Sequence, residues 1–177
     1  MRRNWFLRFV AGGTVEFLRS MPPLVLLVWL YYCMPVLIGL TLPAFETVVM
    51  ALALYTGVFY AEIFRAGLQS VEKGQIEAAY SVGMTGAQVL RRVTGPIAFL
   101  RVFPPFVSQC VLTIKSTSLA YFVAYPELLY EGQRLSVATF RPMEFLTAIA
   151  AIYVALIMPL TLVAAQLEKR VRLKYFG

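Results

Sequence analysis

Four stretches of the chain are long and apolar enough to predict membrane-spanning helices. A span needs about 20 apolar residues, because the hydrocarbon core of a bilayer is roughly 30 Å thick. Residues 20–45 carry no charged side chain, and we place the first span at about 22–40. The uncharged run 47–61 is too short by itself. The second span is therefore expected at about 47–67, with Glu62 and Arg65 near one interface.

The third and fourth spans differ in regularity. The third is predicted at about 103–125, with Pro104 and Pro105 at its start and Lys115 in its middle. The fourth, at about 145–167, is uncharged, and its internal Pro159 predicts a kink that neighbouring helices can accommodate. The pattern predicts an all-α integral membrane protein with about four transmembrane helices in a single domain, 1–177.

The segment between the second and third spans is polar, with apolar residues at helical spacing. These are Ile76, Ala79, Tyr80, Val82, Val89, Leu90 and Val93. They predict two short amphipathic helices, with a turn at Gly83 because glycine tolerates tight reversals. The whole segment, about 71–96, then forms a helical hairpin at the membrane surface. The alternative is a plain surface connector between two spans.

The distribution of basic residues predicts the orientation. Thirteen of the 16 lysines and arginines lie in the N-terminal segment, around the middle loop or at the C-terminus. The opposite loops hold only Arg134 and Arg141, and Lys115 falls within a span. Cytoplasmic loops carry an excess of basic residues, so both termini and the hairpin are expected in the cytoplasm.

Composition excludes several kinds of catalysis. The chain has no histidine and no aspartate, so it lacks a Ser-His-Asp triad, histidine ligands for a metal and an aspartyl-phosphate intermediate. It also has no GxxxxGK[ST] phosphate loop. We therefore expect no enzyme activity and no cofactor, and any ATP hydrolysis would belong to a partner chain. The net charge of +7 is concentrated at the edges of apolar runs, which does not indicate nucleic-acid binding.

The middle loop carries a recognisable motif. Residues 73–79 read Lys-Gly-Gln-Ile-Glu-Ala-Ala, followed by Gly83, by Arg91-Arg92-Val93 and by Pro96. This series resembles the EAA loop of ABC importer permeases. Further segments are similar, in family order, to RGTPLLV, AEIFRGGIQS, LKDTSL, VPEL and TFRPFE of the polar amino-acid branch, which takes up histidine, glutamine, glutamate or arginine. They lie at 19–25, 61–70, 112–119, 125–128 and 139–144.

The resemblance has three local departures and one larger one. Ser116 replaces the usual acidic residue of LKDTSL, Gly95 replaces the usual leucine before Pro96, and Gly86 stands where a bulkier residue is common. Family members also usually carry one more span before the RGTP-like segment. The expected fold is therefore that of a type I ABC importer permease lacking its first helix.

What the resemblance implies is a multi-pass permease subunit in a bacterial inner (plasma) membrane. It would form the translocation path of an ATP-driven importer for polar amino acids and couple to separate ABC ATPase subunits. The expected partners include a second permease subunit, identical or different, and a periplasmic solute-binding protein that docks on residues 41–46 and 126–144. Two alternatives are a truncated permease remnant that does not transport, and a small channel or adaptor without an ATPase.

The resemblance also assigns candidate coupling residues to the hairpin. These are Gly74, Glu77, Ala78, Ala79, Gly83, Arg91, Arg92 and Pro96. Glu77 is expected near a helix start, where the helix dipole favours negative charge. Gly83 is expected to permit a reversal that a β-carbon would obstruct.

The candidate substrate path consists of polar residues at membrane depth. These are Lys115, Ser116, Thr117, Ser118, Glu62 and Arg65. Burying a cation in a bilayer is costly, so Lys115 is a candidate ligand for a substrate carboxylate. Alternatively, Lys115 snorkels to the interface or pairs with Glu62 or Glu127. The spacing of Glu62 and Arg65 suits an ion pair within one helix, which would have a purely structural role.

The asymmetry of basic residues generates a test of orientation. In a variant without Cys33 and Cys110, single cysteines at Lys73 and Arg170 should resist a membrane-impermeant maleimide in intact cells, whereas a cysteine at Arg134 should react. Labelling at position 73 from outside would contradict the predicted orientation.

Overall fold

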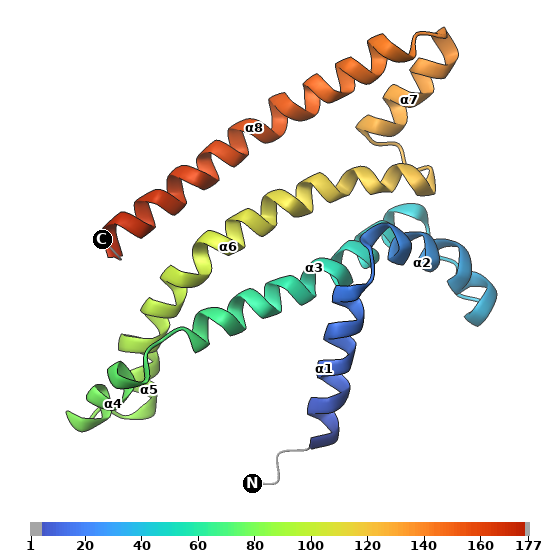
Figure 1. The fold of residues 1–177 in the computed structure, drawn as a ribbon. Coiled ribbons are helices and arrows are strands. Elements are labelled where there is room, and N and C mark those ends of the chain that lie inside the picture. The colour runs from blue at the N-terminus through green and yellow to red at the C-terminus, as the bar shows by residue number, and fades with distance from the viewer. Residues whose placement is uncertain (1–4, 176–177) are drawn as a thin grey trace. The chain divides into compact units, whose positions relative to one another are not determined.

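The computed structural model describes residues 5–175, with side chains for 12–167 and 169. Every regular element in this range is a helix (Figure 1). The chain divides into two compact units, one of residues up to Phe59 with Thr113–Ile157, the other of Tyr60–Leu112 with the residues from Met158 onward. The helices are α1 (Trp5–Ser20), α2 (Pro23–Ile38), α3 (Ala44–Gln69), α4 (Lys73–Ser81), α5 (Gly86–Val89), the π-helix η1 (Leu90–Thr94), α6 (Gly95–Ser116), the 3₁₀-helix η2 (Thr117–Val123), α7 (Leu128–Thr139) and α8 (Pro142–Tyr175).

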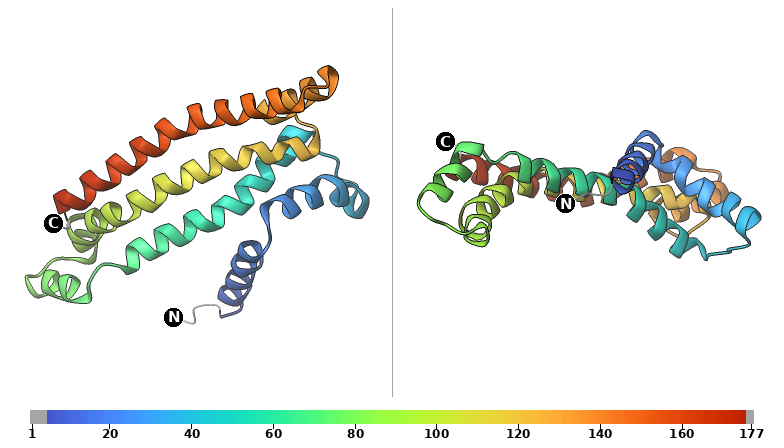
Figure 2. Two further views of the ribbon diagram at one scale, coloured as in Figure 1. Left: turned by 45° about the horizontal axis from the view of Figure 1, so that its top comes forward. Right: turned by 90° about the horizontal axis from the view of Figure 1, so that it is seen from below.

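Three helical stretches of the described chain are long and apolar enough to cross a membrane. They are Ala44–Gln69, Gly86–Val123 and Pro142–Leu167, and the bent pair of α1 and α2 would make a fourth if it is one span. The all-α membrane fold is thus confirmed. The predicted second and fourth spans lie inside α3 and α8, and α8 continues through Pro159 without a break (Figure 2).

The predicted first span corresponds to α2, which is only 16 residues long. Met21 and Pro22 separate it from α1, a helix that the apolar pattern did not predict, and Pro23 is its first residue. Proline fits the first position of a helix but disfavours helical geometry in the residue before it. The two helices accordingly meet at a bend of 100°. At its other end α2 stops at Gly39, whose left-handed conformation has φ 70°.

The helical run that holds the predicted third span begins well before residue 103. Helical structure runs from Gly86 to Val123, and Pro104 and Pro105 lie inside α6 rather than at its beginning. Internal prolines are tolerated in membrane helices because neighbouring groups satisfy the freed backbone carbonyls. The change from α6 to η2 comes at Ser116 and Thr117, within the predicted span.

The apolar core of the first unit joins α2, the start of α3 and η2. Its buried members are Leu26, Leu27, Leu30, Val48, Ala51, Leu52, Ala120 and Val123. Many other apolar side chains are exposed, including Val154 and Leu156 of α8, each 59% exposed. Such surfaces suit contact with lipid or with another membrane subunit.

Helix α7 was predicted only as a loop, and it is attached to α8 at two points. The carboxylate of Glu127 caps its start by accepting hydrogen bonds from the N–H groups of Leu129 (2.9 Å) and Tyr130 (2.8 Å). The same carboxylate accepts a 2.9 Å bond from the Tyr153 hydroxyl of α8. One turn further on, a β-carbon at Gly132 would lie 2.5 Å from Ile149 Cγ1, so α7 and α8 approach closely because this residue is glycine.

Candidate functional site: the surface hairpin and the polar clusters

The first half of the hairpin is α4, and Glu77 lies in its middle. The helix begins at Lys73, with Glu72 at the N-cap, so the expectation that Glu77 is near a helix start is wrong. The favourable effect of a helix dipole falls off within the first turn. Gly74, Glu77 and Ala78 are exposed, whereas Ala79 is buried. The outer face of α4 is thus available to a partner.

A compact turn ends α4 at Gly83. Its N–H donates to the carbonyl of Tyr80 (2.9 Å) and the N–H of Met84 donates to that of Ala79 (3.2 Å), the two bonds of a Schellman motif. Gly83 has φ 82°, which confirms the predicted turn. No atom lies within 4 Å of the place where its β-carbon would be. Glycine is required by the backbone conformation, and the expected steric obstruction is wrong.

The second half of the hairpin is the beginning of a membrane helix, not a separate short one. Thr85 and Gln88 form a capping box, with Gln88 Oε1 accepting from the Thr85 N–H (2.8 Å) and Thr85 Oγ1 accepting from the Gln88 N–H (3.4 Å). From there α5, η1 and α6 follow without interruption. The exposed Arg91 and Arg92 lie in the π-helical turn.

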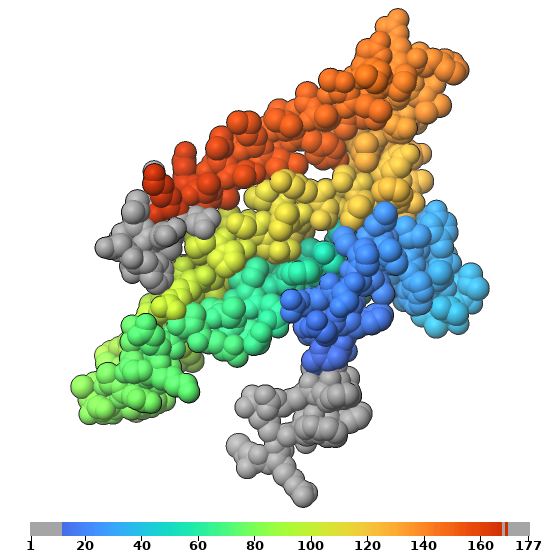
Figure 3. Space-filling view, viewed as in Figure 1, coloured from blue at the N-terminus to red at the C-terminus, as the bar shows by residue number. Residues whose placement is uncertain are grey.

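Gly95 and Pro96 explain this π-helical turn. A β-carbon at Gly95 would lie 2.7 Å from the Leu90 carbonyl oxygen, and Pro96 has no N–H for an α-helical bond. A leucine at position 95, usual in the resembled family, would displace this backbone. Helix α4 packs against α5 and η1, and the buried side chains include Val89. Figure 3 shows α4 and α5 as a knob beyond the end of α3.

The Lys115 cluster lies where α6 changes to η2. The side chain of Lys115 is exposed. The Thr117 hydroxyl donates to the Ile114 carbonyl (2.8 Å) and the Ser118 hydroxyl to the Lys115 carbonyl (2.9 Å), while Ser116 is half-buried. The hydroxyl groups of Thr117 and Ser118 therefore donate their protons to the local backbone and retain lone pairs as acceptors.

The other candidate path residues form an ion pair in the second unit. Arg65 Nη2 lies 2.5 Å from Glu62 Oε2, and Arg65 Nε donates to both carboxylate oxygens at 3.1 Å. Arg65 Nη1 also donates to Gln69 Oε1 at 3.0 Å. The expected pair within one helix is confirmed. Glu127 is engaged in capping α7, so each carboxylate proposed as a partner of Lys115 has partners in its own unit.

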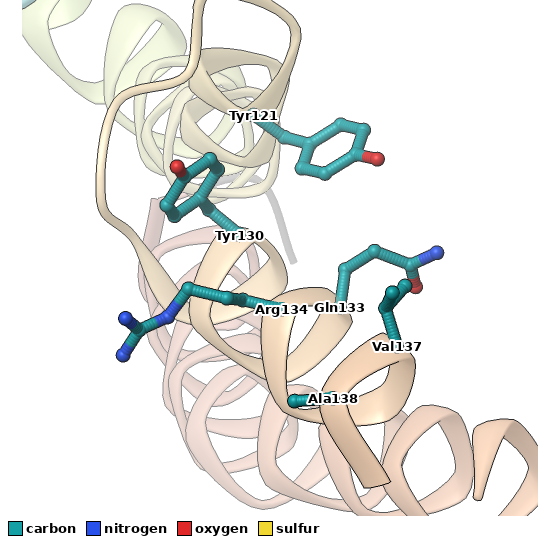
Figure 4. Close-up of a pocket in the computed structure, with 6 residues that line it drawn as sticks. All are labelled: Tyr121, Tyr130, Gln133, Arg134, Val137 and Ala138. Carbon is teal, nitrogen blue, oxygen red and sulfur yellow. The ribbon is translucent and has the colours of Figure 1, made fainter. Parts of the chain in front are cut away.

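A shallow cavity of about 470 Å³ lies on α7 and η2 (Figure 4). Its lining residues are Tyr121, Tyr130, Gln133, Arg134, Val137 and Ala138. The rings of Tyr121 and Tyr130 have centroids 6.4 Å apart, and Arg134 pairs with Glu131 at 2.7 Å. No sequence pattern predicted this cavity, because it depends on α7 being a helix.

Sequence reasoning also missed Arg101 in α6. Its guanidinium donates to the backbone carbonyl of Ser70, next to the end of α3. The available signal was a single arginine inside an otherwise apolar stretch, which was counted only toward the orientation.

Comparison with known proteins matches this chain to one family. Residues 1–173 match the family described as binding-protein-dependent transport system inner membrane component. A probable glutamine ABC transporter permease protein, GlnM of Bacillus subtilis, is 36% identical over 96% of this chain and 78% of its own length. The glutamine transport system permease protein GlnP of Escherichia coli is 29% identical over the same shares.

A solved structure has the same fold. The crystal structure of an amino acid ABC transporter with histidines aligns with a TM-score of 0.87 and 31% identity, covering 96% of this chain and 79% of that one. The alignment therefore covers the hairpin, α6 and α8 together.

Proposed function

This chain belongs to the family of binding-protein-dependent transport system inner membrane components, and on that premise we propose that it is the permease subunit of an ATP-driven importer for polar amino acids. Its relatives include permeases named for glutamine transport, which favours this function over a channel, an adaptor or a remnant without transport. The substrate class follows from those relatives. Glutamine is the first amino acid to test.

The observation that carries the proposal is the rigid knob formed by the hairpin. A Schellman turn, a capping box and buried Ala79 and Val89 hold α4 against the start of a membrane helix. The outer face of α4 presents Glu77 and Ala78, which are exposed. Such a knob can dock in a groove of a separate ATPase and pass its movement directly to α6. We assign coupling to Gly74, Glu77, Ala78, Ala79, Gly83, Arg91, Arg92 and Pro96.

We also assign the substrate path and the remaining partners. Lys115, with Ser116, Thr117 and Ser118, offers a cation and hydroxyl acceptors at membrane depth, which suits an amino acid with its carboxylate and ammonium groups. Glu62 and Arg65 line the path as a pre-formed ion pair. A second permease completes the path, and a periplasmic binding protein docks on residues 41–46 and 126–144, the second of which includes α7. Both termini lie in the cytoplasm.

The first test concerns Lys115. Lys115→Ala should reduce amino-acid uptake by about tenfold or more, since a hydrogen bond to a charged group contributes roughly 1.5–3 kcal/mol. Lys115→Arg should retain more uptake, because it keeps the cation. Uptake of radiolabelled glutamine, glutamate, arginine and histidine into proteoliposomes is the measurement, with Lys169→Ala as the matched control. Normal uptake, or failure of the variant complex to assemble, would assign Lys115 a structural role.

A second test separates coupling from folding in the hairpin. Gly83→Val places a β-branched residue at positive φ, which costs roughly 1–2 kcal/mol locally, whereas Gly86→Val changes a residue at a helix start. Glu77→Ala removes an exposed carboxylate, with Glu72→Ala as its control. Gly83→Val and Glu77→Ala should keep the permease in the membrane yet lower uptake and substrate-stimulated ATP hydrolysis by about fivefold or more, as typical coupling energies imply.

The controls, Gly86→Val and Glu72→Ala, should behave like the wild type. If both hairpin variants import amino acids at the wild-type rate, the hairpin is a plain connector. An ATPase that does not copurify with the wild type in nanodiscs would instead favour the channel or adaptor.

A further inference from the structure

The two ends of the coupling hairpin meet at the junction of α3 and α6, inside the second unit. Gly67 in the last turn of α3 faces Ala98 and Val102 of α6, both buried. A β-carbon at Gly67 would overlap the Val102 side chain and lie 3.3 Å from the Ala98 carbonyl oxygen. The absence of a side chain therefore sets how closely the two helices approach.

Arg101 makes a polar bond across the same junction. Its Nη1 donates to the Ser70 carbonyl, one of the carbonyl groups that the end of α3 leaves unpaired. The Ser70 hydroxyl donates to the Gly67 carbonyl at 2.6 Å and the Ser70 N–H to that of Ala66 at 2.9 Å. A guanidinium at a helix C-terminus is favoured by the helix dipole, and a bond from a charged donor is stronger than a neutral one.

This bond joins the start of the hairpin to its end. Only Val71 and Glu72 separate Ser70 from α4, and Val71 is buried. Arg101 lies in the same uninterrupted helical run as α5 and η1. The bond therefore closes a loop between residues 31 positions apart that contains the whole hairpin.

We propose that Arg101 is a positioning residue that ties the two ends of the coupling hairpin together, so that an ATPase displacing the knob moves α3 and α6 as one body. Without the bond, the segment at Ser70 and Val71 takes up the displacement, and less of it reaches α3. This inference rests on the proposed coupling function and adds a residue that the family motif does not point to.

The test compares variants in the full complex of permease, ATPase and binding protein in nanodiscs. Arg101→Met keeps side-chain length and removes the donors, and Arg101→Lys keeps a cation and a donor. Arg19→Met makes the same chemical change at an exposed arginine paired with Glu16 at 3.8 Å. Gly67→Ala separates α3 from α6 while leaving Arg101 unchanged.

The readout is ATP hydrolysis with empty binding protein and with binding protein loaded with the amino acid that the wild type imports, alongside ATPase retention. For Arg101→Met we expect the complex to retain its ATPase and to hydrolyse ATP at the wild-type basal rate with empty binding protein. The stimulation of ATP hydrolysis by loaded binding protein should fall by about five- to tenfold, which is the lower part of the usual range of coupling between sites. Arg101→Lys should recover part of the stimulation. Gly67→Ala should uncouple in the same way, and Arg19→Met should have no effect.

Two results would overturn the inference alone. In the first, Arg101→Met retains full substrate stimulation while Gly83→Val and Glu77→Ala lose it. In the second, Arg101→Met loses its ATPase or its place in the membrane, because Arg101 would then act on folding. A wild-type complex that retains no ATPase overturns the proposed function and this inference with it.

Discussion

Pairing of backbone groups at helix breaks is the constraint on which this structure depends. Hydrocarbon offers no hydrogen bonds, so each break within or beside a span needs local partners for its N–H and C=O groups. The chain meets this need in a different way at each break. Gly39 caps the end of α2, and the Schellman turn at Gly83 caps the end of α4. Glu127 caps the start of α7, and Arg101 donates a hydrogen bond to the Ser70 carbonyl just after α3.

These pairings also place the parts of the proposed transport machinery. The bonds at Thr85 and Gln88 begin a helical run that is long and apolar enough to cross a membrane, so the second half of the hairpin belongs to the same run as a span. The carboxylate of Glu127 accepts hydrogen bonds from the start of α7 and from Tyr153, which fixes α7 to α8. Buried Thr56 donates its hydroxyl proton to the Leu52 carbonyl at 2.6 Å, within its own helix. The hydroxyl group of Thr56 is thereby paired inside the packed helix.

The sequence predicted the elements that long apolar runs and glycine define, and it missed those that depend on distant contacts. The uninterrupted runs located α3 and α8, and Gly83 located the turn. Helices α4 and α7 both begin after a glutamate, which is not a favoured N-cap residue, so the position of Glu77 was misjudged and α7 was missed. Pro104 and Pro105 resembled a helix start, but membrane helices tolerate internal prolines. The bond from Arg101 to Ser70 spans 31 positions and has no local signal.

The claim that the hairpin moves as one body with α6 can be measured by pulsed electron paramagnetic resonance. Spin labels are attached to cysteines that replace two exposed residues, Ser81 in α4 and Phe99 in α6, in the assembled complex. A label at Ser81 paired with its equivalent on the second permease reports whether the transporter has moved. The account predicts that an ATP analogue changes the distance between permeases and leaves the Ser81 to Phe99 distance unchanged. A shift of the Ser81 to Phe99 distance beyond the width of its distribution would contradict it.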